Sequence, residues 1–203
     1  MNKPYAAAAA RNAAPILGVL RQELRGCSTL LEIGSGTGQH AVMVAAAMPE
    51  LEWQTSDLEQ SHSGIRAWIA DAGLENFLAP TGFDVLSSEP DGRTYDAVFS
   101  ANTAHIMSYV AVSRMFELVG ALLSVPGVFG LYGPFSRGGV FSTPSNEAFD
   151  ASLRARNANM GIRDLDDLEV LAGRNGLQLE RTYAMPANNL LVVWARKSSG
   201  CRR

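Results

Sequence analysis

A glycine-rich turn is the part of the sequence that points most directly to chemistry. Residues 32–38 read Glu-Ile-Gly-Ser-Gly-Thr-Gly, between an apolar run and a helical pattern. Glycine adopts backbone angles closed to other residues and leaves room for a ligand against the main chain. Gly34, Gly36 and Gly38 therefore predict a small-molecule site, in preference to a turn whose glycines serve packing alone.

The spacing of these glycines argues against a dinucleotide. A dinucleotide fingerprint needs glycine at the sixth position of G-x-G-x-x-G, where this chain has Gln39, and no Tyr-x-x-x-Lys pair is present. A nicotinamide-dependent oxidoreductase is therefore a weak alternative. The segment instead resembles the first motif of class I S-adenosylmethionine-dependent methyltransferases. This resemblance implies that S-adenosylmethionine contacts Glu32, Gly34, Ser35, Gly36, Thr37 and Gly38.

Two further carboxylates follow predicted strands. Asp57 lies about twenty residues beyond the glycine turn, where such folds place a carboxylate on ribose hydroxyls, although it also suits an N-cap. For Asp84 the methyltransferase resemblance implies a contact with the adenine amino group, and a purely local turn is an equal alternative. The predicted cofactor site also includes the residues that follow each carboxylate, Leu58 and Val85.

Three polar or aromatic residues near the next two strand ends are candidates for catalysis. His105 is the candidate base because imidazole titrates near neutrality, and a histidine bonded to a backbone carbonyl is the equal alternative. Asn102 is expected to orient the methyl acceptor or to contact the cofactor. It is not followed by the prolines of the Asn-Pro-Pro-Tyr signature of nucleic-acid amino methyltransferases. Tyr132 is predicted to wall the methyl group, with core packing as the alternative.

The amino-acid composition limits the classes of partner that the protein is expected to bind. The net charge of −3 gives no cationic field for nucleic acid, and no apolar run is long enough to cross a bilayer. Cys27 and Cys201 lack disulfide or metal-ligand spacing, and the histidines at 40, 62 and 105 share no ligand spacing, so no metal is predicted. We therefore expect a cytoplasmic protein with a small-molecule substrate. The sequence leaves its oligomeric state open.

Strands and helices that alternate along the chain must position these residues. Apolar runs predict strands at 29–33, 51–56, 95–100 and 127–132, and a short strand leading into Phe83 and Asp84. Helical spacing predicts helices at 6–24, 39–48, 63–72, 109–123 and 164–175, with Pro15 marking a break or a new first turn. Residues 177–184 and 190–196 predict an antiparallel hairpin. The pattern indicates an α/β fold, and the resemblance implies a Rossmann-like, mostly parallel seven-stranded sheet with helices on both faces.

A chain of 203 residues is long enough for one core, so we expect a single domain over 1–197. Residues 133–163 interrupt the alternation and are predicted to be a substrate-side insertion, with a plain surface excursion as the alternative. Residues 198–203 are predicted to be a disordered tail.

Longer segments resemble the methyltransferase-like protein 26 family. They include Arg11-Asn12, residues 31–40, Tyr132-Gly-Pro-Phe135, Gly161-Ile-Arg-Asp164 and residues 185–190. This resemblance runs from about Tyr5 to Arg196 and implies a class I methyltransferase with no established acceptor. The chain departs from the family pattern at Thr103, Ala104 and Tyr109, beside the predicted acceptor. A catalytically silent cofactor-binding protein that acts through a partner is the alternative function.

Overall fold

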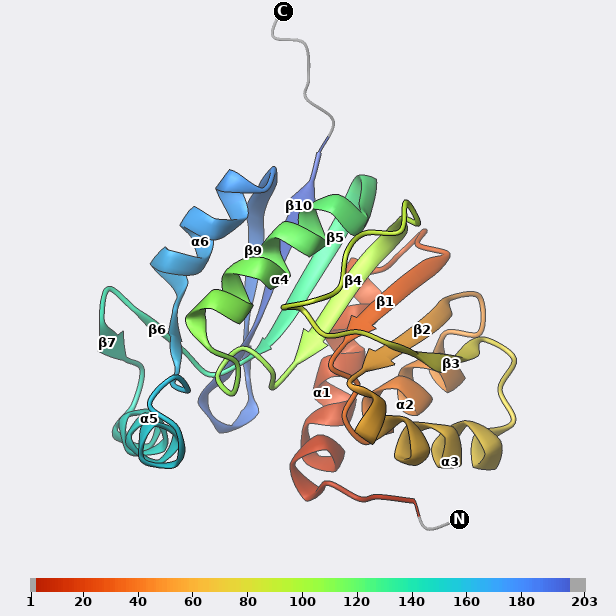
Figure 1. Cartoon of the computed structure of the whole chain (residues 1–203), viewed down its shortest axis with the longest axis horizontal. Coiled ribbons are helices and arrows are strands. Elements are labelled where there is room, and N and C mark those ends of the chain that lie inside the picture. The colour runs from red at the N-terminus through yellow and green to blue at the C-terminus, as the bar shows by residue number, and fades with distance from the viewer. Residues whose placement is uncertain (1–2, 198–203) are drawn as a thin grey trace, which may run out of the picture.

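A seven-stranded sheet forms the centre of the molecule. The computed structural model describes residues 3–197, so the predicted tail at 198–203 lies outside the described residues. The strand order is β3-β2-β1-β4-β5-β10-β9 (Figure 1). The strands are β1 (Thr29–Ile33), β2 (Glu52–Asp57), β3 (Phe77–Gly82), β4 (Tyr95–Ala101), β5 (Leu123–Gly133), β9 (Leu177–Met185) and β10 (Asn189–Arg196). In this order, neighbouring strands from β3 to β5 are parallel, and β10 is antiparallel to both of its neighbours. This confirms the predicted sheet and hairpin.

Helices cover both faces of this sheet because successive strand residues point to opposite sides. Leu31 and Val98 pack with α4 (Tyr109–Leu122) and α6 (Leu165–Arg174), which lie in front of the sheet in Figure 1. Leu30 and Phe99 pack on the other face. The helices there are α1 (Ala7–Glu23), α2 (Gln39–Ala47) and α3 (His62–Ala72), and two short 3₁₀ turns, η1 (Glu59–Ser61) and η2 (Pro186–Asn188), complete the connections. Two apolar layers thus hold the sheet between them.

The expectation of a break at Pro15 is wrong. Helix α1 runs without interruption from Ala7 to Glu23 with Pro15 inside it. Proline in a helix interior lowers helix stability by about 3 kcal/mol. The many alanines of α1 favour the helix, and the side chains of Ile16 and Leu20 are completely buried. Tertiary packing therefore outweighs the local penalty.

The segment between β5 and α6 folds into a small second sheet and a helix. The second sheet has the order β7-β6-β8, with β6 (Phe135–Arg137), β7 (Val140–Phe141) and β8 (Arg163–Asp164). Helix α5 (Pro144–Arg156) begins with Thr143 as its N-cap and lies near the edge at which β5 ends (Figure 1). Strands of two or three residues are too short to carry a hydrophobic period, so the sequence did not indicate this sheet.

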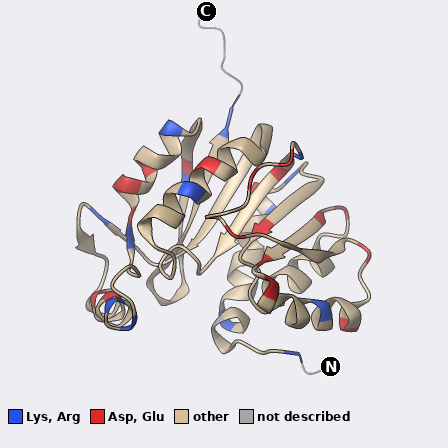
Figure 2. Cartoon of the chain, viewed as in Figure 1, with Lys and Arg blue, Asp and Glu red and all other residues tan. Residues whose placement is uncertain are grey.

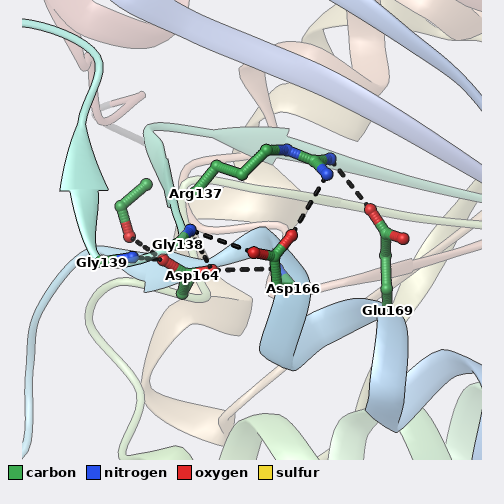
Figure 3. Close-up of polar contacts among 7 residues, drawn as sticks. Arg137, Gly138, Gly139, Asp164, Asp166 and Glu169 are labelled. Carbon is green, nitrogen blue, oxygen red and sulfur yellow. Dashed lines mark hydrogen bonds and ion pairs between the residues drawn. The ribbon is translucent and has the colours of Figure 1, made fainter.

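Asp164 holds the β6–β7 turn against the start of α6. Its carboxylate accepts hydrogen bonds from Ser136 Oγ at 2.9 Å and from the amide of Gly139 at 2.7 Å (Figure 3). It also accepts from the amide of Asp166 at 3.0 Å as N-cap of α6. Arg137 adds ion pairs to Asp166 and Glu169. The small sheet is thereby anchored to the helix that covers the main one.

Charge and hydropathy are mixed over the surface. Acidic and basic residues are interspersed on α5 and α6 (Figure 2). Among residues 3–197, no helix combines the length and the apolar character required to span a bilayer.

We predict that Phe116→Ala destabilises the fold by about 3–5 kcal/mol, because removing a buried aromatic ring leaves a cavity. Phe116 is fully buried and contacts the rings of Phe129 and Trp194 edge-on. Urea unfolding followed by circular dichroism measures the change. Val170→Ala, at a side chain that is 53% exposed on α6, is the matched control and is expected to stay within about 0.5 kcal/mol of wild type. Equal losses in both variants would contradict the core assignment.

Candidate functional site

The carboxyl ends of the five parallel strands bring the predicted residues to one edge of the sheet. Asp84 follows β3, Asp57 ends β2, the glycine turn follows β1 and Asn102 follows β4. Backbone bonds connect neighbouring strand ends: Gly34 N donates to Ser56 O at 3.0 Å, and Asn102 N donates to Tyr132 O at 2.9 Å. Ligands of open α/β sheets bind at this edge.

Glycine is needed in this turn for different physical reasons at different positions. All have positive φ, at +74° for Gly34, +56° for Gly36 and +84° for Gly38. A Cβ at Gly34 would lie 2.6 Å from Thr103 Cγ2, so the chain itself requires glycine there. A Cβ at Gly36 would meet no protein atom within 4 Å. Gly36 therefore faces open space, as a ligand-binding turn requires.

Glu32 and Ser35 lie beneath the turn. The Glu32 carboxylate is 1% exposed and accepts a hydrogen bond from Trp53 Nε1 at 3.0 Å. Burial raises the pKa of Glu32 to about 7. Ser35 is also buried, and its hydroxyl accepts from Ser56 N at 3.1 Å. These two side chains therefore support the turn from below, and their predicted cofactor contacts stay predictions.

Asp57 connects the turn to the second strand. One carboxylate oxygen accepts from Gly36 N at 2.7 Å, and the other accepts from Leu58 N at 2.7 Å. A carboxylate has about four acceptor positions, so both oxygens keep capacity for ligand hydroxyls. Leu58 is 43% exposed beside it.

Gln39 connects the same turn to the N-terminal segment. Its Oε1 accepts from Thr37 Oγ1 at 3.0 Å and from Ala6 N at 2.5 Å. Ala6 is the N-cap of α1 and supplies no side-chain cap, so Gln39 serves that end of the helix instead. The residue that departs from the dinucleotide fingerprint thus holds the start of α1 to the glycine turn.

The third carboxylate is engaged locally. Asp84 Oδ1 accepts a hydrogen bond from Leu86 N at 3.0 Å. This is the local turn that the sequence predicts as the alternative to an adenine contact. The other carboxylate oxygen has no hydrogen-bond donor among the described residues. Val85 is buried and packs with the cluster under α4. An adenine contact at Asp84 stays a prediction.

The residues after β4 form a single turn that faces the glycine turn. Asn102 has φ of +61°, a left-handed conformation that asparagine tolerates better than most residues. Thr103 is buried, its hydroxyl lies 2.6 Å from Ser100 Oγ, and its methyl group packs toward Gly34. The departure from the family pattern at Thr103 therefore lies against the glycine turn.

His105 lies between α5 and the end of β5. It is 8% exposed, and its ring meets the Phe149 ring edge-on at a centroid distance of 5.4 Å. Burial, followed by the charges of Arg163 and Arg156, lowers the pKa of His105 to about 4. The imidazole is therefore neutral at physiological pH and weakly basic. This favours accepting a hydrogen bond over removing a proton.

Tyr132 is buried in the core under α1. It is 1% exposed, and its hydroxyl has no hydrogen-bond partner within the described part of the chain. Burial raises the pKa of Tyr132 to about 12, and the Asn189 side chain offsets this in part. Tyr132 thus packs in the core cluster, which is the alternative given for it, and its predicted role beside the methyl group stays a prediction.

Sequence reasoning missed the contacts that join residues 133–163 to this edge. Asn146 Nδ2 donates to Asn188 O at 3.1 Å, which ties α5 to the turn before β10. Arg163 is 8% exposed and donates to backbone carbonyls, including Ala104 O at 3.0 Å. Hydrophobic periodicity carries no signal for such long-range polar contacts.

The structure offers no metal site among the residues that it describes. No three His, Cys, Asp or Glu side chains gather there as metal ligands. Burial, with the charge of Asp96 adding to it, raises the pKa of the Cys27 thiol to about 11, which leaves it protonated and unreactive.

Comparison with known proteins supports the fold. Residues 3–196 match the model of a family described as a protein of unknown function, DUF938. An O-methyltransferase family protein from Burkholderia thailandensis superposes with a TM-score of 0.83 at 15% identity, covering 95% of this chain and 58% of that one. Mitomycin 7-O-methyltransferase MmcR gives 0.81 at 18% identity, covering 94% and 54%. Human N-acetylserotonin methyltransferase in complex with SAM gives 0.79 at 12% identity, covering 95% and 53%.

These similarities confirm the predicted Rossmann-like, class I methyltransferase fold. The chain spans a little over half of the length of each solved structure named. At these levels of identity the likeness concerns the fold.

We predict that His105→Gln flattens the pH dependence of stability between about pH 6.5 and 4. The folded pKa of His105 is below its ordinary value of 6.5, so the unfolded chain binds more protons in this window and the unfolding free energy falls as the pH drops. The difference from wild type is on the order of 3 kcal/mol at pH 4, from urea titrations at each pH. His40 titrates in both proteins, so the difference isolates His105. Parallel curves for the two proteins would contradict a neutral, buried His105.

Proposed function

The chain belongs to the DUF938 family of proteins of unknown function, and we propose that it is an S-adenosylmethionine-dependent methyltransferase that acts on a small molecule. The observation that carries the proposal is the open space over Gly36 beside the Asp57 carboxylate. We also propose that it belongs with the methyltransferase-like protein 26 proteins and works in the cytoplasm, on the motifs and composition described above.

The residues present fit this cofactor. Gly36 offers bare main chain, and Asp57 offers acceptor capacity to ribose hydroxyls one strand away. A charge-assisted hydrogen bond to such a carboxylate contributes about 1.5–3 kcal/mol. Gln39 occupies the position at which a dinucleotide fold needs its third glycine, which favours this cofactor over a nicotinamide.

The chain's own residues would align the acceptor more than activate it. S-adenosylmethionine supplies a methyl group on a positively charged sulfur, and transfer requires an in-line approach of the acceptor atom. Asn102 extends from the end of β4 and can donate and accept hydrogen bonds. His105, with its pKa near 4, would accept a hydrogen bond from the acceptor's N–H or O–H and so orient its lone pair.

The structure of residues 133–163 supports a small acceptor. Helix α5 contacts the β9–β10 turn through Asn146 and Asn188, and contacts His105 through Phe149. These contacts join α5 to the residues that follow β4 and to the turn before β10. We propose that residues 133–163 are the substrate-side insertion and that the acceptor is a metabolite and not a nucleic-acid duplex or a protein surface.

We predict that S-adenosylhomocysteine raises the thermal unfolding midpoint and that NAD does not. A ligand at one hundred times its dissociation constant adds about 2.7 kcal/mol of stability. Gly36→Val is expected to abolish the shift, because its side chain would occupy the ligand's space.

Gly73→Val is the matched control for this substitution. Gly73 ends α3 with φ of +60°, and a Cβ there also meets no atom within 4 Å. Both variants therefore carry similar backbone strain, and only Gly36→Val is expected to lose ligand binding. Retained binding in Gly36→Val, or a shift with NAD alone, would contradict the assigned site.

We predict that the protein transfers label from methyl-labelled S-adenosylmethionine to a low-molecular-weight product in a metabolite extract. Mass spectrometry identifies the product and its methylated atom, and Gly36→Val is the negative control. Ligand binding without any labelled product would favour the catalytically silent alternative. Label found only in protein or nucleic acid would exclude a small-molecule acceptor.

A further inference from the structure

The loop after β4 carries two predicted site residues but has few hydrogen bonds of its own. We call residues 102–107 the β4 loop. Within it, Ile106 N and Met107 N both donate to Thr103 O, at 3.0 and 3.1 Å. A single turn of this kind is not stable in isolation, because ordering the backbone costs more than one or two hydrogen bonds return. Other parts of the molecule must therefore fix Asn102 and His105.

A guanidinium from beyond α5 provides the missing contacts. Arg163 Nε donates to Ala104 O at 3.0 Å, and its Nη2 donates to Met107 O and, at 2.8 Å, to Asn159 O. The amide of Gly161 donates to His105 O at 2.9 Å. Three carbonyls of the β4 loop, those of Ala104, His105 and Met107, are thus held by residues that lie more than fifty positions later in the chain.

The charge of Arg163 has no carboxylate in direct contact among the described residues. Arg163 is 8% exposed, and no Asp or Glu within the described ranges forms an ion pair with it. The neighbouring Asp150 accepts instead from Arg154 Nε and from Ile162 N, each at 2.7 Å. A buried charge is tolerated only when hydrogen bonds satisfy it, so the carbonyls of the β4 loop and of Asn159 stabilise this guanidinium, and the nearby charge of Asp150 adds to them.

The geometry of these contacts requires arginine. Its planar group offers donors in several directions at once, and here it reaches two carbonyls of the β4 loop and one after α5. A lysine ammonium is a single point and reaches fewer of them. The contacts leave the side chains of Asn102 and His105 free, because every bond is made to the backbone.

We infer that Arg163 is a positioning residue that fixes the backbone of the β4 loop from Ala104 to Met107 and so holds His105 at the carboxyl edge of the sheet. Its value to catalysis rests on the proposed function, whereas the fixing of the loop does not. We assign Arg163 to positioning and not to catalysis, because its Nε and Nη2 donate to the protein's own carbonyls.

Three variants separate the positioning of the β4 loop by Arg163 from the effect of the Arg163 charge. Arg163→Met removes the charge and all three hydrogen bonds. Arg163→Lys keeps the charge but loses the planar group that donates to several carbonyls at once. Arg156→Met is the matched control, because Arg156 is an exposed α5 residue whose charge also acts on His105 and whose side chain makes no hydrogen bond among the described residues.

Hydrogen exchange followed by mass spectrometry reports on the loop. We expect peptides covering residues 102–107 to exchange at least tenfold faster in Arg163→Met and Arg163→Lys, with β1 and α4 core peptides unchanged. Arg156→Met is expected to exchange like wild type. Unchanged exchange of the β4 loop in both Arg163 variants would overturn the proposal.

Titration of the His105 ring by NMR separates the fixing of the ring from the charge of Arg163, while unchanged exchange of the β1 and α4 peptides excludes a general loss of stability. His105→Gln identifies the resonance. We expect the midpoint to rise from about 4 toward 6.5 in Arg163→Met, which loses the fixed burial of the ring and a nearby cation, and to rise in Arg163→Lys as well, which keeps the cation but not the fixed burial. Arg156→Met removes a cation alone and is expected to give the smallest rise. A midpoint that stays at the wild-type value in Arg163→Met would show that the ring is not held beside Arg163, and would overturn the proposal.

The remaining outcomes are also decisive. If Arg163→Met does not fold, Arg163→Lys carries the exchange test, and unfolding of both variants would overturn the proposal in favour of a role in the whole fold. Binding of S-adenosylhomocysteine to wild type is measured separately by calorimetry. Its absence would overturn the proposed function without altering the exchange and titration results.

Discussion

The hydrogen bond from Gly36 to Asp57 sets the geometry on which the site depends. It joins the turn after β1 to the end of β2, and it forms only because these strands are parallel and in register, with Ile33 beside Ser56. The buried Glu32 and Ser35 support the same turn from below, through Trp53 and Ser56. The bare backbone at Gly36 therefore faces outward at a fixed distance from a carboxylate.

The alternation of apolar runs and helical patterns was sufficient to predict the main sheet. β1 was predicted at the residues observed, and the predicted carboxyl ends of β2, β4 and β5 fell within one residue of the observed ends. Apolar runs bounded by turns indicate β1, β4 and β5, whereas β2 is mostly polar and was predicted from the alternation of strands and helices. The glycine turn and Asp57 could be predicted together for the same reason. The continuation of α1 through Pro15 could not be predicted, because the packing of α1 outweighs the local helix penalty of proline.

The surroundings of His105 could not be predicted because they depend on contacts between distant residues. Phe149, Gly161 and Arg163 lie in a polar segment without periodicity, and no pattern in that segment indicates that Arg163 is buried. The same contacts explain why His105 is a poor base: burial and two nearby cations favour the neutral imidazole. A residue's type indicates its possible chemistry, and its neighbours determine which protonation state is present.

The bond between Gln39 and Ala6 links the start of α1 to the turn that would hold a ligand. Two elements joined in this way obey thermodynamic linkage: whatever favours one conformation of the turn favours docking of α1 by the same free energy, and the converse holds equally. If a ligand in the turn strengthens or weakens this bond, docking of α1 changes its affinity by the same factor, at a place that the helix does not touch.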